Sequence, residues 1–247
     1  MTEITPAREL PLPMAMPMLL SFVAGYVDSY TYLTLFGLFV AQVTGSFVVG
    51  GAELVSHDSG IAGKLLAIVA FLVAAAATAA LIALAREAGR AALPLMLGLE
   101  ALLLAIFAAM ILFGPPIHGA ADWYGIVAGV FAAMAMGAQS VLVRLLMKGI
   151  PQTNVMTGNM TQLGIETTAI ILAWRRRARE PHNTDAAVEF AAVRERLRIV
   201  LAVASGFLGG AAAGAGAYAT TNARGAVLAV AIVLGLALWA LYRERRM

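Results

Sequence analysis

Two stretches of this chain decide its fold: residues 43–53, which read VTGSFVVGGAE, and residues 156–166, which read MTGNMTQLGIE. Both contain the pattern T-G-[S/N]-x4-G-x-E, and the second copy follows the first by 113 positions. Three further identities lie upstream at an offset of 112, pairing Gly25 with Gly137, Leu33 with Leu145 and Gly37 with Gly149. Recurrence at a fixed spacing predicts two structurally related halves, at about residues 14–113 and 122–243.

The composition is that of a protein embedded in lipid. Hydrophobic residues make up 61% of the 247 residues and charged residues only 13%, and the mean hydropathy is +0.86. Soluble domains contain about 45–50% apolar and about 25% charged residues. Because a soluble fold of this length cannot hide so much apolar surface from water, we expect an all-α polytopic membrane protein.

Eight apolar stretches follow one another along the chain, and a spanning helix needs about 20 apolar residues. Two stretches, 43–56 and 154–173, hold the Thr-Gly motifs; the first is too short to span and the second is rich in polar residues. We therefore predict two short or re-entrant Thr-Gly helices and six spanning helices. The six lie at about 14–34, 62–85, 91–113, 122–147, 195–219 and 225–242.

The positions of Lys and Arg predict the topology, because these residues concentrate on the cytoplasmic side. With six spans and a cytoplasmic N-terminus, 15 of the 17 lie inside, among them Arg8, and only Lys64 and Arg224 lie outside. With eight spans the division is 12 to 5. Three spans in each half reverse the orientation of the second half, so we expect an inverted 3+3 repeat in a single membrane domain, residues 1–247. The predicted location is the bacterial inner membrane, with both termini cytoplasmic.

The segment at about 174–194 is the only sizeable hydrophilic insert, and we predict a basic cytoplasmic loop there. Its arginine run, Arg175–Arg177 with Arg179, is interpreted as a topology anchor. Contact with anionic membrane lipids is the lesser alternative. The net charge of +3 is explained by such runs, so we expect no nucleic-acid partner. Two small-residue stretches, Ala74–Ala80 and Gly206–Gly216, predict close helix packing.

Polar side chains at membrane depth cost free energy and therefore need a reason. Ser21, Gly25, Asp28 and Tyr32 share one face of the first helix, and Asp28 is the strongest candidate for a solute-binding or proton-coupling group. The alternative is a structural carboxylate bonded to hydroxyls or a basic residue. The matching face of the fifth span adds further candidates, Gln139, Ser140 and Arg144, of which Arg144 is equally able to reach the interface.

The Thr-Gly motifs supply the remaining candidates. A threonine hydroxyl can cap the free N–H groups at the start of a helix, and two helix N-termini facing each other would frame a polar pocket. Four residues would line that pocket: Thr44, Ser46, Thr157 and Asn159. The alternative is that they only form tight turns. Glu53 and Glu166 fit either proton carriers or water-facing groups at helix ends.

Catalytic and cofactor motifs are missing. There is no nucleotide-binding glycine loop and no hydrolase motif. The chain has no cysteine, and His57, His118 and His182 are far apart, so we expect no metal site and no cofactor. We do not expect an enzyme. Of the three functions that we consider, a lipid-modifying membrane enzyme is the weakest hypothesis, and the other two are given below.

The stretches FVAGYVDSYTYLTLFGLFVAQVTGSFVVGGAEL and GAQSVLVRLLMKGIPQTNVMTGNMTQLGIE resemble the YoaK-like family of bacterial membrane proteins of unknown function. The resemblance covers nearly the whole chain and implies a six-span fold. It implies as signature positions Asp28, Thr44, Gly45, Gln139, Arg144, Thr157, Gly158 and Asn159. Ser46 and Ser140 stand where the family usually has asparagine, which argues against a symmetric pair of amides here.

Our first hypothesis is a secondary transporter or facilitator of a small polar or anionic solute, with its site between the inverted halves. The alternative is a non-transporting scaffold, sensor or assembly factor that acts through the Arg-rich cytoplasmic segment. The partners expected are membrane lipids and the small-molecule solute, and the sequence leaves open a homo-oligomer.

Overall fold

The structure is a computed structural model that describes residues 13–56 and 60–246, and this part is helical with no strand. Arg8, which entered the charge count, lies outside the described residues. The elements are α1 (Ala15–Thr34), α2 (Val43–Ser56), α3 (Ile61–Glu87), α4 (Ala92–Phe113), α5 (Trp123–Leu146), α6 (Met156–Arg179), α7 (Thr184–Thr221), the 3-10 helix η1 (Asn222–Ala226) and α8 (Val227–Glu244).

Each of the six long apolar segments forms a helix; five lie near their predicted bounds, whereas the helix predicted at 195–219 begins eleven residues earlier, at Thr184. Among the described residues, four stretches are long and apolar enough to cross a membrane: α3, α4, α5 and the continuous run Thr184–Glu244, which contains α7 and α8. The predicted first span, α1, is not among them. Only 22% of the apolar window of α3 is buried inside the protein, and Val69 and Leu72 point outward. Such faces need lipid around them, so the chain is a membrane-embedded helical protein.

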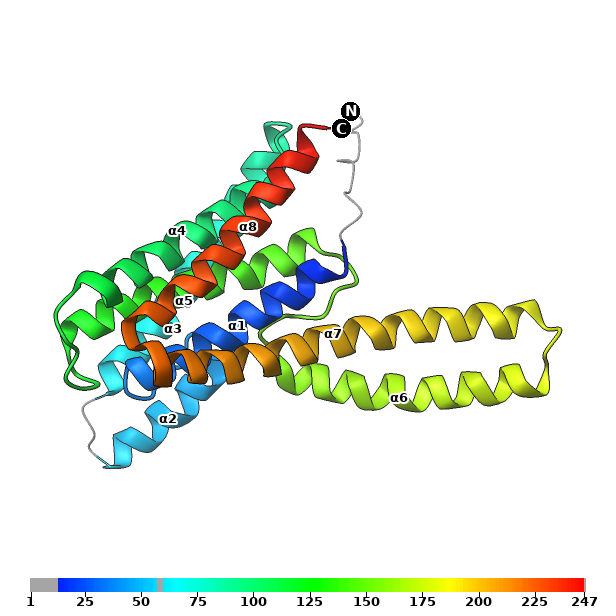
Figure 1. Cartoon of the computed structure of the whole chain (residues 1–247), viewed down its shortest axis with the longest axis horizontal. Helices are drawn as coiled ribbons and strands as arrows, with labels where there is room; N and C mark the ends of the chain where they lie inside the picture. Colours follow the sequence, from blue (N-terminus) through cyan, green and yellow to red (C-terminus); the bar gives the residue numbers. More distant parts are fainter. Residues whose placement is uncertain (1–12, 57–59, 247) are drawn as a thin grey trace.

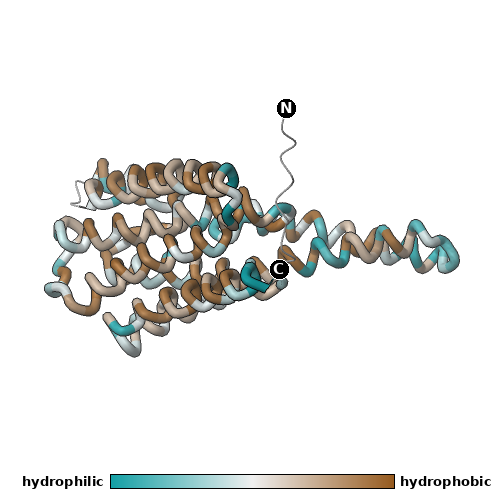
Figure 2. Tube along the Cα trace, turned by 90° about the horizontal axis from the view of Figure 1, so that it is seen from above, coloured by the Kyte–Doolittle hydropathy of each residue, from teal (hydrophilic) through white to brown (hydrophobic). Residues whose placement is uncertain are grey.

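The body of the molecule is held together mainly by pairs of helices that are not consecutive in the chain. α1 packs along α7, α3 packs along α5, and α4 lies against α5 and α8 (Figure 1). Figure 2 shows apolar residues along these helices. Glycines let the α1–α7 pair approach closely, as the small-residue stretch predicts: a Cβ on Gly206, Gly210 or Gly214 would lie within 2.4 Å of a carbonyl oxygen of α1.

The structure differs from the sequence expectation at α6 and at the hydrophilic segment after it. α6 has 24 residues and is therefore not a short helix, whereas α2 has 14. The segment 174–194 is mostly helix, because α6 continues to Arg179 and α7 begins at Thr184. Arginine favours helix, and the Asn183 side chain caps α7 by accepting from Asp185 N and Ala186 N.

α6 and the first half of α7 form an antiparallel hairpin, residues 156–200, that projects beyond the body (Figure 1). Buried residues recur every seven positions on both helices, the spacing typical of a coiled coil. On α6 they are Asn159, Glu166 and Ala173, and on α7 they are Ala186, Val193 and Val200. The stripe is one residue wide, which explains why mean hydropathy gave no sign of the hairpin.

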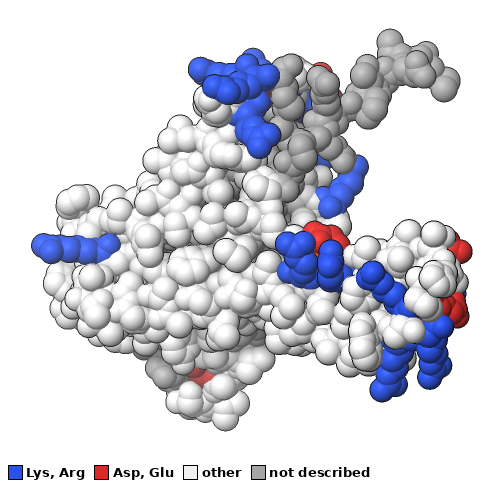
Figure 3. Space-filling model, turned by 45° about the vertical axis from the view of Figure 1, so that its right-hand side comes forward, with Lys and Arg blue, Asp and Glu red and all other residues white. Residues whose placement is uncertain are grey.

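Charge is distributed as a membrane requires. In Figure 3, Lys and Arg gather near the chain ends, on the hairpin and at one tip of the body, while the face between them is nearly uncharged. Which side of the membrane each end occupies stays a prediction from the charge count.

We expect Gly210→Ala to lower the free energy of unfolding by about 1–3 kcal/mol, since its methyl group would lie 2.0 Å from Phe22 O and force α1 and α7 apart. Gly216→Ala, on the same helix with nothing within 4 Å of the added Cβ, is the matched control and should be neutral or stabilising by up to about 1 kcal/mol. Thermal unfolding in detergent, followed by circular dichroism, measures both. Equal effects of the two substitutions would contradict the close crossing.

Candidate functional site: the junction of the two Thr-Gly segments

The loop between α1 and α2, residues 35–42, folds back along α1 to Asp28. The Asp28 carboxylate is 2% exposed and accepts hydrogen bonds from Val40 N and Ala41 N, both at 2.8 Å. Gln42 N donates to it at longer distance. Because these N–H groups lie in the loop directly before α2, Asp28 supplies the acceptor that the backbone of the loop needs when it is buried. Its structural partners are thus backbone N–H groups, not hydroxyls or a basic residue.

The loop between α5 and α6, residues 147–155, folds back along α5 in the way that the first loop folds back along α1. Gly149 has φ +79 where the first loop has Gly37 at φ +88, a backbone conformation that glycine adopts without strain. Ser140, at the position matching Asp28, accepts a hydrogen bond from the Asn154 side-chain amide. A neutral pair therefore replaces the carboxylate in the second half.

The two loops meet at Asn154. Its Nδ2 also donates to Ala41 O of the first loop at 3.3 Å, and residues 41 and 154 occupy matching positions in the two halves. From this contact α2 and α6 run away in opposite directions (Figure 1). The starts of both Thr-Gly helices therefore lie close together inside the protein. We call this region, where loop 35–42 meets loop 147–155, the junction.

Ser46 and Asn159 make equivalent hydrogen bonds in the two motifs. Ser46 Oγ donates to Phe39 O at 2.7 Å, and Asn159 Nδ2 donates to Gln152 O at 2.7 Å. Each side chain thus holds a carbonyl seven residues earlier and keeps its loop folded against the helix start. The expected capping by threonine is wrong for α6, because no side chain caps its N-terminus and Thr157 is exposed in its first turn.

Buried amide and hydroxyl groups connect the second loop to the body. Gln139 Nε2 donates to Leu20 O and to Thr153 Oγ1, both at 2.8 Å. Ser21 Oγ lies within hydrogen-bond distance of Thr153 O and of Val203 O, at 3.0 and 2.7 Å. Thr153 thus attaches the loop to α1 and α5, and Ser21 also links α1 to α7.

Two acceptors at the junction are unused. Gln139 Oε1 and Asn154 Oδ1 are buried and have no hydrogen-bond partner among the described residues. Unsatisfied buried acceptors are rare in native proteins and call for an explanation such as a bound water or ligand. The junction therefore offers two oxygens to a donor that comes from outside the chain.

The predicted site residues divide into two groups. The structure brings Asp28, Ser46, Gln139, Ser140 and Asn159 to the junction. It leaves four others exposed: Tyr32, Thr44, Arg144 and Thr157.

Tyr32, one of the exposed residues, packs its ring 4.8 Å from that of Phe39. Sequence reasoning did not select Thr153 and Asn154 as site residues, although the polar run Gln152-Thr153-Asn154 directly before the second motif was a usable signal.

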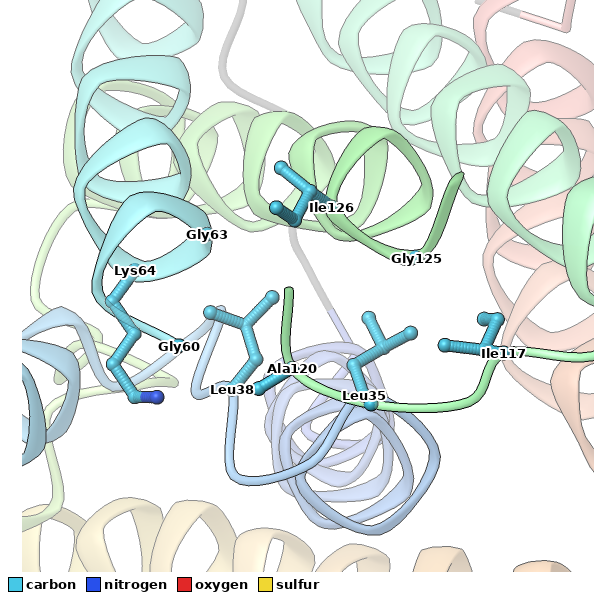
Figure 4. Close-up of a pocket in the computed structure, with 10 residues that line it drawn as sticks. Leu35, Leu38, Gly60, Gly63, Lys64, Ile117, Ala120, Gly125 and Ile126 are labelled. Carbon is cyan, nitrogen blue, oxygen red and sulfur yellow. The ribbon is translucent and has the colours of Figure 1, made fainter. Parts of the chain in front are cut away.

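The open space beside the junction is unequal on its two sides. On the α6 side a groove of about 350 Å³ is lined by Asn159, Gln162, Glu166 and Arg196 together with the second loop. On the α2 side a cavity of about 10 Å³ lies between the first loop and the start of α3 (Figure 4), too small for more than about one water molecule. Of these two spaces, only the one on the α6 side is large enough for a small solute.

Glu53 and Glu166, the proton-coupling candidates at matching positions, are both paired. Glu53 Oε1 lies 2.6 Å from Lys64 Nζ. Glu166 accepts from Arg196 Nε at 3.0 Å and from Gln162 at 2.8 Å. In each half the partner base comes from the helix that follows, α3 or α7, so neither carboxylate is an unpaired group facing water.

Residues 16–240 match the model of a protein family, DUF1275, which is described as being of unknown function. The match agrees with the YoaK-like resemblance of the sequence and covers both Thr-Gly motifs. No curated protein and no solved structure matches the chain.

We expect Asp28→Ala to lower the free energy of unfolding by about 2–4 kcal/mol, because it leaves buried N–H groups of the first loop without an acceptor. Asp28→Asn keeps one oxygen and should cost about half as much. Hydrogen exchange of the Val40 and Ala41 amides should accelerate in both variants. The control is Ser29→Ala on the same helix, and unchanged exchange at residues 40 and 41 in Asp28→Ala would contradict this role.

The shared role of Ser46 and Asn159 predicts that each residue tolerates the other's side chain. Ser46→Asn and Asn159→Ser should keep the thermal stability within about 1 kcal/mol of the original chain, whereas alanine at either position should cost more than about 1 kcal/mol. Thermal unfolding of the four variants in one detergent tests this. Should the exchanges be as damaging as alanine, the two turns are not equivalent.

Proposed function

We propose that this chain, which belongs to the DUF1275 family of proteins of unknown function, is a secondary transporter or facilitator of a small polar or anionic solute in the bacterial inner membrane. The observation that carries the proposal is the contact between the two loops at Asn154 and Ala41, from which α2 and α6 diverge. Broken helices whose starts meet inside the bilayer are typical of solute sites in secondary transporters.

The proposal includes six spans arranged as an inverted 3+3 repeat. Its support is the correspondence of the packing: α1 packs on α7 as α5 packs on α3. Gly25 approaches Phe207 O of α7, and the matching Gly137 approaches Phe71 O of α3. Equivalent glycines thus make equivalent crossings between the halves, as a two-fold relation in the membrane plane requires.

The groups at the junction favour a solute with mixed chemistry. The N-terminal ends of α2 and α6 favour negative charge, and the unused oxygens of Gln139 and Asn154 accept from a hydroxyl or amino group. A small solute that carries both an anionic group and a donor fits this set. Protons coupled through Asp28, Glu53 or Glu166 would supply the driving force.

A specific observation favours the second candidate, a non-transporting scaffold, sensor or assembly factor. The hairpin projects beyond the body, and its α6 exposes Leu172 and Trp174 beside the arginine run. An apolar and basic projection fits a partner protein or the surface of anionic lipid. In neither role does the chain act as an enzyme or carry a cofactor.

Reconstituted proteoliposomes, tested with a panel of small hydroxy acids, amino acids and inorganic anions, should take up at least one solute. We expect Asn154→Ala to lower that uptake more than about tenfold, because it removes the contact between the loops and one unused acceptor. Ser205→Ala, on the exposed side of α7, is the control for expression and folding. Unchanged uptake in a folded Asn154→Ala variant would exclude the junction as the site, and the absence of any uptake would favour the scaffold.

A further inference from the structure

The two ion pairs beside the junction, Glu53–Lys64 and Glu166–Arg196, occupy matching places but differ in their surroundings. The Lys64 side chain is 2% exposed and the Glu53 side chain 13%, whereas the Arg196 side chain is 54% exposed. The α2-side pair is therefore enclosed in the protein, and the α6-side pair borders the open groove. This difference follows the difference between the two spaces, about 10 and about 350 Å³.

Gly60 makes room for the enclosed pair. A Cβ at residue 60 would lie 2.9 Å from both Glu53 Oε1 and Lys64 Nζ, and 3.1 Å from the Ala120 Cβ. The pair is thus covered by the start of α3 and by the loop between α4 and α5. Leu35 and Leu38, from the loop that Asp28 holds, also line the small cavity (Figure 4).

Stability alone is a poor explanation for this pair. Removing two charges from water costs several kcal/mol per ion, which their attraction recovers only when all the polar atoms are satisfied. Here Glu53 Oε2 is buried without a hydrogen-bond partner in the described part of the chain. The net free energy of such an ion pair is therefore small, and the pair can break when water enters. This property is expected of a contact that opens and closes, and not of one that only stabilises the fold.

We propose that the groove lined by Asn159, Gln162, Glu166 and Arg196 is the open vestibule through which a small polar solute reaches the junction, and that the Glu53–Lys64 pair closes the corresponding vestibule on the α2 side. The inference rests on the proposed transport function. It assigns this structure to the state open on the α6 side, which the predicted topology places in the cytoplasm.

The chain has no cysteine, so single cysteines report access directly. Ile126→Cys lies in the small cavity and Ile199→Cys in the groove, and the two variants are matched in chemistry. In detergent, where both ends of the protein are in contact with solution, a charged thiol reagent should label residue 199 more than about tenfold faster than residue 126.

Breaking the pair should open the α2 side. In the Ile126→Cys background we expect Lys64→Met to raise the labelling rate more than about tenfold, because a buried carboxylate without its partner draws water into the cavity. The double variant Glu53→Gln with Lys64→Met removes the closing ion pair without leaving a buried charge. It should also raise the labelling rate, and it covers the case in which Lys64→Met does not fold. Gly60→Ala pushes against the pair without changing charge and should act in the same direction. Arg224→Met, which also removes a base, is the control and should leave the rate unchanged.

The result that overturns the inference is a residue 126 that stays protected in all three folded variants, or one that labels as fast as residue 199 in the unaltered chain. Failure of the proposed function looks different. If the variants expose residue 126 but no solute is taken up by proteoliposomes, the closing contact is supported and transport is not. If Asn154→Ala abolishes uptake while residue 126 never opens, transport stands and the closing contact is dropped.

Discussion

The hydrogen bonds from Val40 and Ala41 to the buried Asp28 carboxylate are the contact on which the arrangement of the first half depends. At membrane depth a non-helical loop is tolerated only where protein groups satisfy its backbone. By accepting these N–H groups, Asp28 lets the chain turn back and start α2 inside the protein. Ser140 and Asn154 achieve the same return in the second half without a charge, so the two turns correspond in position and differ in their electrostatics.

Much of the helical layout could be predicted from sequence, because the apolar segments set the long helices and the repeated Thr-Gly pattern indicated two equivalent turns. The details of the turns could not. Ser46 and Asn159 reach carbonyls of their own loops, and nothing in the pattern separates that bond from threonine capping. The hairpin was missed for a different reason: its contact stripe takes one residue in seven and includes the polar Asn159 and Glu166, so the hydropathy averaged along the two helices does not reveal it.

Most polar groups at the junction serve the fold first. Ser21, Gln139 and Thr153 bind backbone carbonyls or one another, so a polar residue at membrane depth is not by itself a solute ligand. What the fold leaves over is small: the unused oxygens of Gln139 and Asn154, and a groove that reaches the second loop and Asn159. The functional proposal rests on that remainder, together with the meeting of the two loops.

The length of α7 has a mechanical consequence. Its 38 residues form an uninterrupted rod about 57 Å long, which begins at the hairpin tip and ends beside η1. The helix packs closely on the backbone of α1 through three of its glycines, Gly206, Gly210 and Gly214. Because α7 is one continuous helix, any displacement of the exposed hairpin tip would also move this crossing with α1, the helix that carries Asp28.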